Sequence, residues 1–391
     1  MNKPARTPQP GSAQEADEGN STPVSGFDGR ERIPVTQPYL PDRAKFLRYV
    51  DGIFERNWHT NNGPLVRTLT DRLKEYLGVE NLLLVGNGTL ALQIAYCALG
   101  LRENKNSNAI TTPYSFVATA STLRWEGITP VFADINANTF CLDPNNIAHS
   151  VSKNTEAIVP VHLYGNCCDV EAIEKVARAR HLKVIYDGAH AFGVQFKGKS
   201  VLNHGDATTL SFHATKLFHT CEGGAIVFRR KEDFKKAKLL INFGIEGPEK
   251  IGPLGINAKM SEIHAAMGLC ALDDIDDILN ARADACHAYE RMLGNYFKFP
   301  EWNPDATRNF AYFPIVFNNR KELLQGRKAL EKLGIGTRRY FYPTLDTLSY
   351  LQPQPEQPVA RNIAQRVLCL PLPAPGLDLS QIKSSLNLER G

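Results

Sequence analysis

The sequence lacks the long apolar runs of membrane and secreted proteins. No 18 consecutive residues are apolar, and the N-terminus has no hydrophobic segment of the kind that a secretory signal carries. The 8 cysteines form no CxxC pair and no group with histidine at metal-ligand spacing. We therefore expect a cytoplasmic protein that does not enter a membrane, with free, buried thiols and no metal site.

An excess of charge of one sign is also missing. The chain has 45 Lys and Arg residues against 41 Asp and Glu residues, a formal net charge of +4, and no basic run with interleaved aromatic residues. This balance does not indicate a nucleic acid partner. The length of 391 residues is enough for two domains around a large core.

The composition and patterning divide the chain into three parts. Residues 1–30 are rich in Pro, Gln, Ser, Glu, Asp and Gly, and we expect a disordered tail there. We expect a large domain over residues 31–275 and a smaller α/β domain over residues 276–391. In the large part, apolar strand-like runs alternate with helical segments, which predicts a mostly parallel sheet with ligands at the C-terminal ends of its strands.

Longer patterns predict individual elements. The apolar spacing of residues 43–57 predicts a helix with Leu47, Val50 and Phe54 on one face. We also expect a helix over 261–296, a strand over 309–317 and a helix over 321–333.

Lys216 has the setting of a lysine that forms a Schiff base. Small and hydroxylated residues precede it in Ser211-Phe212-His213-Ala214-Thr215, and a glycine pair and an apolar strand follow it. Such a segment can present an amine in a cleft. Asp187 ends an apolar strand upstream. Taken alone, each residue has a plainer interpretation, a solvated loop lysine and an ordinary strand-end aspartate.

Together the two residues predict a site for pyridoxal phosphate (PLP). This cofactor withdraws electrons only when its pyridine nitrogen is protonated, so a carboxylate must face that nitrogen while a lysine holds the aldehyde carbon. Asp187 and Lys216 are the candidates for these two roles.

A glycine turn predicts the phosphate site. Gly86-Asn87-Gly88-Thr89 leads into a helix that begins near Leu90, and the free N–H groups at a helix N-terminus bind phosphate. The alternative is a dinucleotide, because Gly86, Gly88 and Ala91 satisfy a loose GxGxxG/A pattern. That pattern alone is a weak signal, and no acidic residue ends a clear second strand beyond it.

The runs YDGAHAFG, SFHATKLFHTCEGGAIVF and LGINAKMSEIHAAMG resemble the DegT/StrS-type sugar-nucleotide aminotransferases. The resemblance covers about residues 33 to 391. It implies the aspartate-aminotransferase fold, with a large PLP-binding domain and a smaller C-terminal α/β domain. A sister group of dehydratases has histidine in place of the lysine, so Lys216 indicates transamination.

The resemblance also implies roles for residues around the cofactor. Phe116 would stack on the PLP ring and Ser211 would bind its phosphate beside Gly88, Thr89 and Leu90. Asn242 would reach the phosphate bound in a neighbouring subunit, which implies a homodimer with shared active sites. From their spacing after Asp187, Ala189 is placed to cover the other ring face and His190 to bond the phenolic oxygen. The alternatives are that Phe116 is a core aromatic residue, His190 a buried structural histidine and Asn242 a turn asparagine.

Two segments are candidates for substrate binding. Gly255-Ile256-Asn257-Ala258-Lys259 resembles the family's G-x-N-Y-R motif, but Lys259 stands in place of arginine, which leaves its role open. Arg338, Arg339 and Tyr340 resemble the segment that approaches the cleft, where guanidinium groups suit a diphosphate or a carboxylate. An exposed turn is the alternative for this second segment.

The resulting hypothesis is a PLP-dependent aminotransferase that moves an amino group from L-glutamate to a nucleotide-linked 4-keto-6-deoxy sugar. The motifs most resemble enzymes that act on dTDP-4-keto-6-deoxyglucose in deoxyamino-sugar and glycan biosynthesis. Lys216 would act as general acid and base. The alternatives are a 3-keto sugar aminotransferase, an NAD-dependent sugar oxidoreductase and a non-catalytic regulator with this fold.

Overall fold

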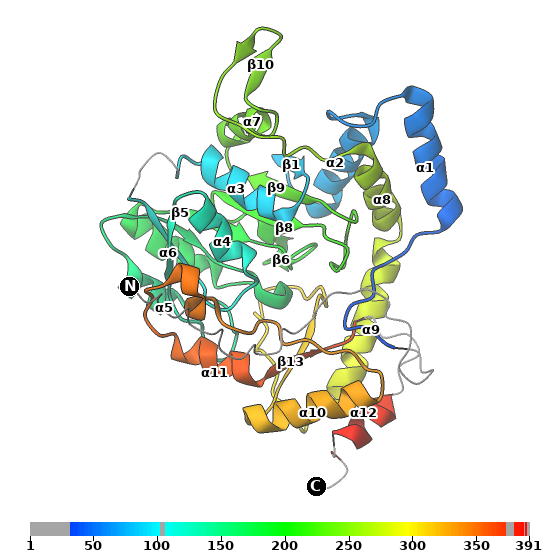
Figure 1. Cartoon of the computed structure of the whole chain (residues 1–391), viewed down its shortest axis with the longest axis vertical. Coiled ribbons are helices and arrows are strands. Elements are labelled where there is room, and N and C mark those ends of the chain that lie inside the picture. Colours follow the sequence, from blue (N-terminus) through cyan, green and yellow to red (C-terminus); the bar gives the residue numbers. More distant parts are fainter. Residues whose placement is uncertain (1–31, 102–105, 373–378, 387, 389–391) are drawn as a thin grey trace, which may run out of the picture.

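A seven-stranded sheet forms the centre of the computed structural model (Figure 1), which describes residues 32–101, 106–372, 379–386 and 388. The predicted tail over residues 1–30 lies outside this range. The strand order is β1-β9-β8-β5-β4-β2-β3. The strands are β1 (Leu82–Val85), β2 (Asn108–Thr111), β3 (Thr129–Phe132), β4 (Thr155–Val159), β5 (Lys183–Asp187), β8 (Ala207–Ser211) and β9 (Gly224–Phe228).

The sheet is mostly parallel, as the sequence predicts. The neighbours from β3 through β2, β4 and β5 to β8 pair in parallel, whereas β9 is antiparallel to both β8 and β1. Successive side chains of a strand point to opposite faces, so each face needs its own helical cover. In β4, Ile158 joins one apolar cluster while Ala157 and Val159 join another.

Helices cover both faces of the sheet. Side chains of α3 (Gly88–Ala98) and α7 (Lys231–Leu240) belong to the cluster around Val159, and those of α2 (Pro64–Leu77), α5 (Pro144–Ser150), α6 (Val170–Arg180) and α8 (Glu262–Asp273) to the cluster around Ile158. The remaining elements of this part are α1 (Arg43–Arg56), α4 (Ala118–Trp125), η1 (Leu163–Gly165), β6 (Gln195–Phe196), β7 (Lys199–Ser200), η2 (Val201–Asn203), β10 (Ile245–Gly247) and β11 (Lys250–Ile251).

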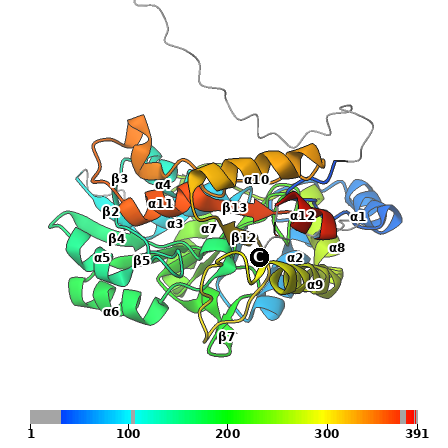
Figure 2. The ribbon, with the colours of Figure 1, turned by 90° about the horizontal axis from the view of Figure 1, so that it is seen from below.

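The C-terminal elements gather at one end of the molecule (Figures 1 and 2). Helix α9 (Ile275–Leu293) leads to them from α8. Strands β12 (Phe313–Val316) and β13 (Val367–Leu370) pair antiparallel there and share an apolar cluster with α9, α10 (Arg320–Lys332) and α12 (Leu379–Ser385). We call this end the C-terminal unit. It also contains η3 (Leu345–Thr347), η4 (Ser349–Leu351) and α11 (Pro358–Arg366).

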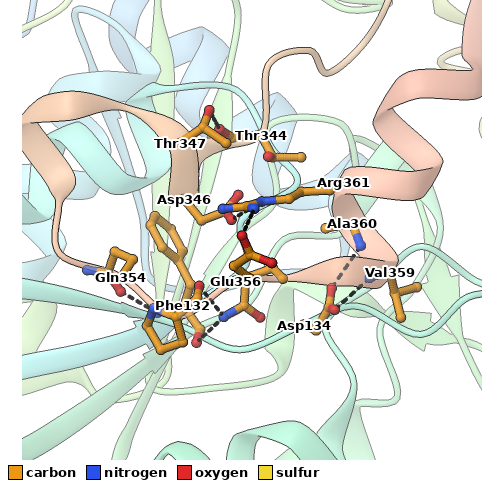
Figure 3. Close-up of polar contacts among 12 residues, drawn as sticks. Phe132, Asp134, Thr344, Asp346, Thr347, Gln354, Glu356, Val359, Ala360 and Arg361 are labelled. Atoms are coloured by element: carbon orange, nitrogen blue, oxygen red, sulfur yellow. Dashed lines mark hydrogen bonds and ion pairs between the residues drawn. The ribbon is translucent and has the colours of Figure 1, made fainter. Parts of the chain in front are cut away.

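Polar contacts join the C-terminal unit to the edge of the sheet (Figure 3). Asp134, two residues beyond β3, accepts hydrogen bonds from the N–H groups of Val359 and Ala360 at 2.8 and 2.9 Å. These N–H groups lie in the first turn of α11, where no acceptor exists within the helix. Arg361 then pairs with the buried Asp346 at 2.8 Å. The carboxylate of Asp134 therefore caps a helix of the other unit.

Three of the predicted elements are wrong in detail. The helix over 261–296 is two helices that meet at Asp274, whose φ of −109° and ψ of 17° interrupt the helical backbone. The strand over 309–317 begins only at Phe313, because Phe310 has a left-handed φ of 53°. In α1, which packs against α8, the buried residue is Ile53, while Phe54 is 68% exposed.

The thiols differ in part from the expectation that they are buried. None of the eight cysteines, all of which lie in the described ranges, forms a disulfide, but Cys221 is exposed and Cys97 is only partly buried. None of the helices in the described ranges is both long and apolar enough to cross a membrane.

Candidate active site

The start of α3 lies beside the end of β8. The Asn87 side chain caps the helix by accepting the N–H of Leu90 at 2.8 Å, so this amide is already used within the chain. The N–H groups of Gly88 and Thr89 precede it in the first turn and point away from the helix. A Cβ on Gly88 would lie 2.9 Å from Cβ of Ser211, so glycine is what lets the Ser211 hydroxyl lie next to these donors.

Asp187 lies at the C-terminal end of the neighbouring strand. In the parallel pairing of β5 and β8 it is opposite Thr209, two residues before Ser211. Its Oδ2 accepts the hydroxyl of Thr119 at 2.8 Å, and its Oδ1 accepts the N–H of Ala189 at 3.1 Å. Burial raises the pKa of Asp187, and these two donors and the charge of Lys216 oppose that rise. Each oxygen keeps a lone pair for one more donor.

Lys216 brings its amine to the same region. Nζ donates to the hydroxyl of Tyr312 at 3.2 Å. Burial lowers the pKa of Lys216 to about 8, while Tyr340 and Asp187 favour its charged form. A lysine with such a pKa is partly neutral near pH 8, as a nucleophile or general base requires.

Aromatic rings line the site. His190 is buried, and its Nδ1 accepts the N–H of Tyr164 at 3.1 Å, which leaves Nε2 as its remaining polar atom. Burial holds the pKa of His190 well below its usual value, so the ring is neutral. Phe341 stacks parallel to it with 5.9 Å between ring centroids. The ring centroid of Phe116 lies 6.4 Å from that of Phe341. Phe116 is 53% exposed, so a face of its ring is free to meet a flat ligand.

Three residues of the site have no role in the prediction from sequence. Thr119 lies one helical turn after Phe116, and residues at that spacing share one face of a helix. The sequence alone could therefore have placed its hydroxyl beside the predicted ring. Tyr312 and Phe341 come from the C-terminal unit, and nothing in the sequence around Tyr312 indicates that it meets Lys216.

Asn242 and Lys259 lie together on a different part of the surface. Nζ of Lys259 donates to Oδ1 of Asn242 at 2.8 Å and lies 5.2 Å from the centre of the Phe243 ring. Both residues line a hollow of about 380 Å³ between α2, β1 and α7. Because lysine has only donors, the amide of Asn242 turns its Nδ2 group away from Lys259, free to meet an acceptor.

The structure separates the two predicted arginines. Arg338 lies over the ring of Tyr340 at 5.0 Å, and both are near Tyr312. Arg339 donates to the carbonyl of Ala364 at 3.0 Å and lies 3.5 Å from the centre of the Tyr342 ring. Only Arg338 therefore stands beside the aromatic residues of the site.

The sheet topology contradicts the dinucleotide alternative. A dinucleotide fingerprint connects two neighbouring parallel strands. Here β1 lies at the sheet edge and is antiparallel to β9, and β2 is not its neighbour. The glycine turn therefore lies outside any such unit.

The residues present fit PLP. Donors for a phosphate lie at Gly88, Thr89 and Ser211, an acceptor for a ring N–H at Asp187, and an amine at Lys216. The fold and these groups define a PLP-dependent transferase of the aspartate-aminotransferase type.

The comparisons with known proteins give the family. Residues 41–384 match the DegT/DnrJ/EryC1/StrS aminotransferase family, and the chain belongs to it. This membership confirms the predicted family, fold, cofactor and aminotransferase class.

Two curated relatives and one solved structure extend over most of the chain. The chain is 45% identical over 352 residues to a dTDP-4-amino-4,6-dideoxy-D-glucose transaminase of Shigella dysenteriae, covering 88% of this chain and 94% of the relative. It is 39% identical to the enzyme of the same name from Escherichia coli, covering 87% and 93%. The crystal structure of DesI in the presence of its TDP-sugar product is similar with a TM-score of 0.84 and 33% identity, covering 92% of both chains.

Proposed function

We propose that this protein transfers the amino group of L-glutamate to dTDP-4-keto-6-deoxyglucose and forms dTDP-4-amino-4,6-dideoxyglucose. The observation that carries the substrate is the 45% identity to the Shigella dysenteriae transaminase of that name, over 94% of its length. Lys216 and Asp187 supply the groups that the reaction needs. No observation favours the 3-keto alternative, a redox reaction or a regulatory role.

Each residue of the site has a role in this proposal. The cofactor, when bound, withdraws electrons from the carbon that loses or gains the amino group. Asp187 holds a proton at the ring nitrogen, and Thr119 and Ala189 hold its carboxylate in place. Lys216 moves a proton to and from the reacting carbon, with a pKa near 8 that suits both directions. Gly88, Thr89 and Ser211 bind the phosphate, Phe116 and Ala189 face the ring, and His190 Nε2 bonds the phenolic oxygen.

We further propose a homodimer in which Asn242 serves the partner's site. Its amide is oriented by Lys259, and the segment after it exposes large apolar side chains. Ile251 is 76% exposed and Leu254 79% exposed, and the β10–β11 hairpin protrudes from the molecule (Figure 1). Exposed apolar side chains of this size are typical of an interface. A two-fold axis would bring the same surface of both chains together.

Several finer assignments belong to the same proposal. Arg338 and Tyr340 are the candidates for contacts with the substrate, whereas Arg339 faces away from the site. The division into domains at residues 275 and 276 and the cytoplasmic location remain predictions.

The substrate is tested with a panel of nucleotide sugars. The enzyme is supplied with PLP, L-glutamate and dTDP-, UDP- or GDP-linked keto-deoxy sugars, and NMR locates the new amino group. We expect turnover of the dTDP-4-keto-6-deoxy sugar with the amino group at C4, and none with Lys216→Ala. A product aminated at C3, or preference for another nucleotide, would contradict the proposed substrate but not the family.

A further inference from the structure

The amine of Lys216 is held by a residue of the C-terminal unit. Its partner Tyr312 lies 96 positions away in the sequence, directly before β12. The hydroxyl is 3.2 Å from Nζ. Burial raises the pKa of Tyr312, so the phenol is neutral and its oxygen can accept the N–H of the amine.

The segment that carries Tyr312 is anchored from both parts of the molecule. The buried side chain of Asn309 donates to the carbonyls of His190 and Phe192 at 2.8 and 2.9 Å, and it accepts the N–H of Ala311 at 3.2 Å. On the other side, the buried guanidinium of Arg282 in α9 donates to the carbonyl of Ala311 at 3.3 Å. These bonds fix the backbone next to Tyr312.

The ring of Tyr312 is packed on three sides. Its centroid lies 4.7 Å from that of His190, 5.7 Å from that of Tyr164 and 5.2 Å from that of Tyr340. With the backbone and the ring both held, the hydroxyl has one position, and that position is beside the amine.

We propose that Tyr312 is a further catalytic residue, whose hydroxyl accepts a hydrogen bond from Lys216 whenever the amine is released and so aims its lone pair at the reacting carbon. Asn309 is then a positioning residue that acts through Tyr312. Since Tyr312 precedes β12 while Lys216 follows β8, the contact exists only when the C-terminal unit is docked. The proposal rests on the proposed function in one respect, that Lys216 is the cofactor lysine.

Other charged or titratable groups also act on this pair. The charged or titratable groups that act on Lys216 or Tyr312 are Asp187, Tyr164, His190, Arg282, Arg338, Tyr340 and Cys369. A variant that removes only the hydroxyl leaves all of them in place, so Tyr312→Phe isolates the proposed contact.

The first test uses the protein without PLP. Acetic anhydride labels neutral amines, and mass spectrometry follows the labelling of Lys216 as the pH changes. A hydrogen bond to the phenol favours the ammonium form of Lys216. Tyr312→Phe is therefore expected to lower the pH at which half of Lys216 is labelled by about one unit, and we call this pH the labelling midpoint. Tyr289→Phe is the matched control, because it removes a buried hydroxyl that bonds the carbonyl of Pro371 in the C-terminal unit, and its midpoint should equal that of the unaltered protein.

The second test follows proton transfer. Lys216 exchanges the Cα proton of L-glutamate with solvent, and NMR in deuterated water measures this rate in the PLP-loaded enzyme. Tyr312→Phe should lower kcat for exchange by about 10- to 100-fold, with KM for L-glutamate within about twofold. Asn309→Ala should act in the same direction, and the double variant should lose little more than Tyr312→Phe alone.

The outcomes separate this proposal from the proposed function. Borohydride reduction first tests whether PLP is fixed on Lys216 of the unaltered protein, and a different lysine would contradict the proposed function itself. If Lys216 is confirmed, an unchanged labelling midpoint together with an unchanged exchange rate in Tyr312→Phe would overturn the role of Tyr312. An equal loss from Tyr289→Phe would assign the effect to packing and would overturn it as well.

Discussion

Thr119 donates its hydroxyl hydrogen to Oδ2 of Asp187 at 2.8 Å, across the gap between α4 and the end of β5. The bond fixes the rotation of a buried carboxylate that also accepts the N–H of Ala189. Phe116 lies one turn before Thr119, so a single short segment both orients the carboxylate and carries the ring predicted to stack on the cofactor. The plane of Asp187 and the face of Phe116 are thereby set relative to each other.

The reaction of Lys216 with PLP should depend on pH. Burial lowers the lysine pKa to about 8, and only the neutral amine attacks the cofactor aldehyde. At a pH below about 8 most of the amine is charged, so the rate at which PLP-free enzyme captures PLP should rise as the pH passes through about 8. Stopped-flow absorbance of the bound cofactor measures this. A rate that keeps rising to about pH 10 would indicate a lysine with an ordinary pKa.

Asp187→Asn should bind PLP on Lys216 but transaminate slowly. The amide cannot stabilise a positive charge at the ring nitrogen, so we expect kcat to fall by at least about 100-fold. Asp305→Asn, a change of the same chemistry on the surface, is the control. Steady-state assays measure kcat, and visible absorbance confirms that the cofactor is bound. Turnover of Asp187→Asn within a few-fold of normal would show that another group protonates the ring.

Mixed dimers should reveal the shared site. Lys216→Ala removes the amine and Asn242→Ala weakens the partner's phosphate site, so a mixed dimer carries both changes in one site and neither in the other. Co-expressed and separately tagged chains should regain activity well above either parent. The control mixes Lys216→Ala with Asp187→Asn, which leaves one change in each site and should restore nothing. No recovery in the first mixture, with mixing confirmed and Asn242→Ala impaired, would place Asn242 outside the partner's site.

Asp134→Ala should destabilise the protein. It removes the cap of α11 and leaves the N–H groups of Val359 and Ala360 without their acceptor, which costs about 1–2 kcal/mol of unfolding free energy. Urea unfolding measures the loss. Asp305→Ala changes a side chain that is about half exposed and 3.8 Å from its partner Lys197, and it should change the stability by less than about 0.5 kcal/mol. Equal stability of the two variants would contradict the capping role.

The sequence by itself determined the elements and residues whose signals are local. The mostly parallel sheet follows from the alternation of apolar runs with helical segments, and the glycine turn before α3 follows from the chemistry of a helix N-terminus. Lys216 and Asp187 could be selected as candidates from the same kind of local signal, and their roles at the cofactor remain predictions.

Only the tertiary structure decided which distant side chains meet. Tyr312 reaches Lys216 because the C-terminal unit folds back onto the sheet. Arg338 lies over the ring of Tyr340, whereas Arg339 donates to the carbonyl of Ala364 in α11. The apolar pattern of α1 was read correctly as a helix, but Phe54 on the predicted apolar face is exposed and Ile53 is the buried residue. Periodicity fixes which residues share a face, whereas the partner of that face depends on contacts between segments far apart in the chain.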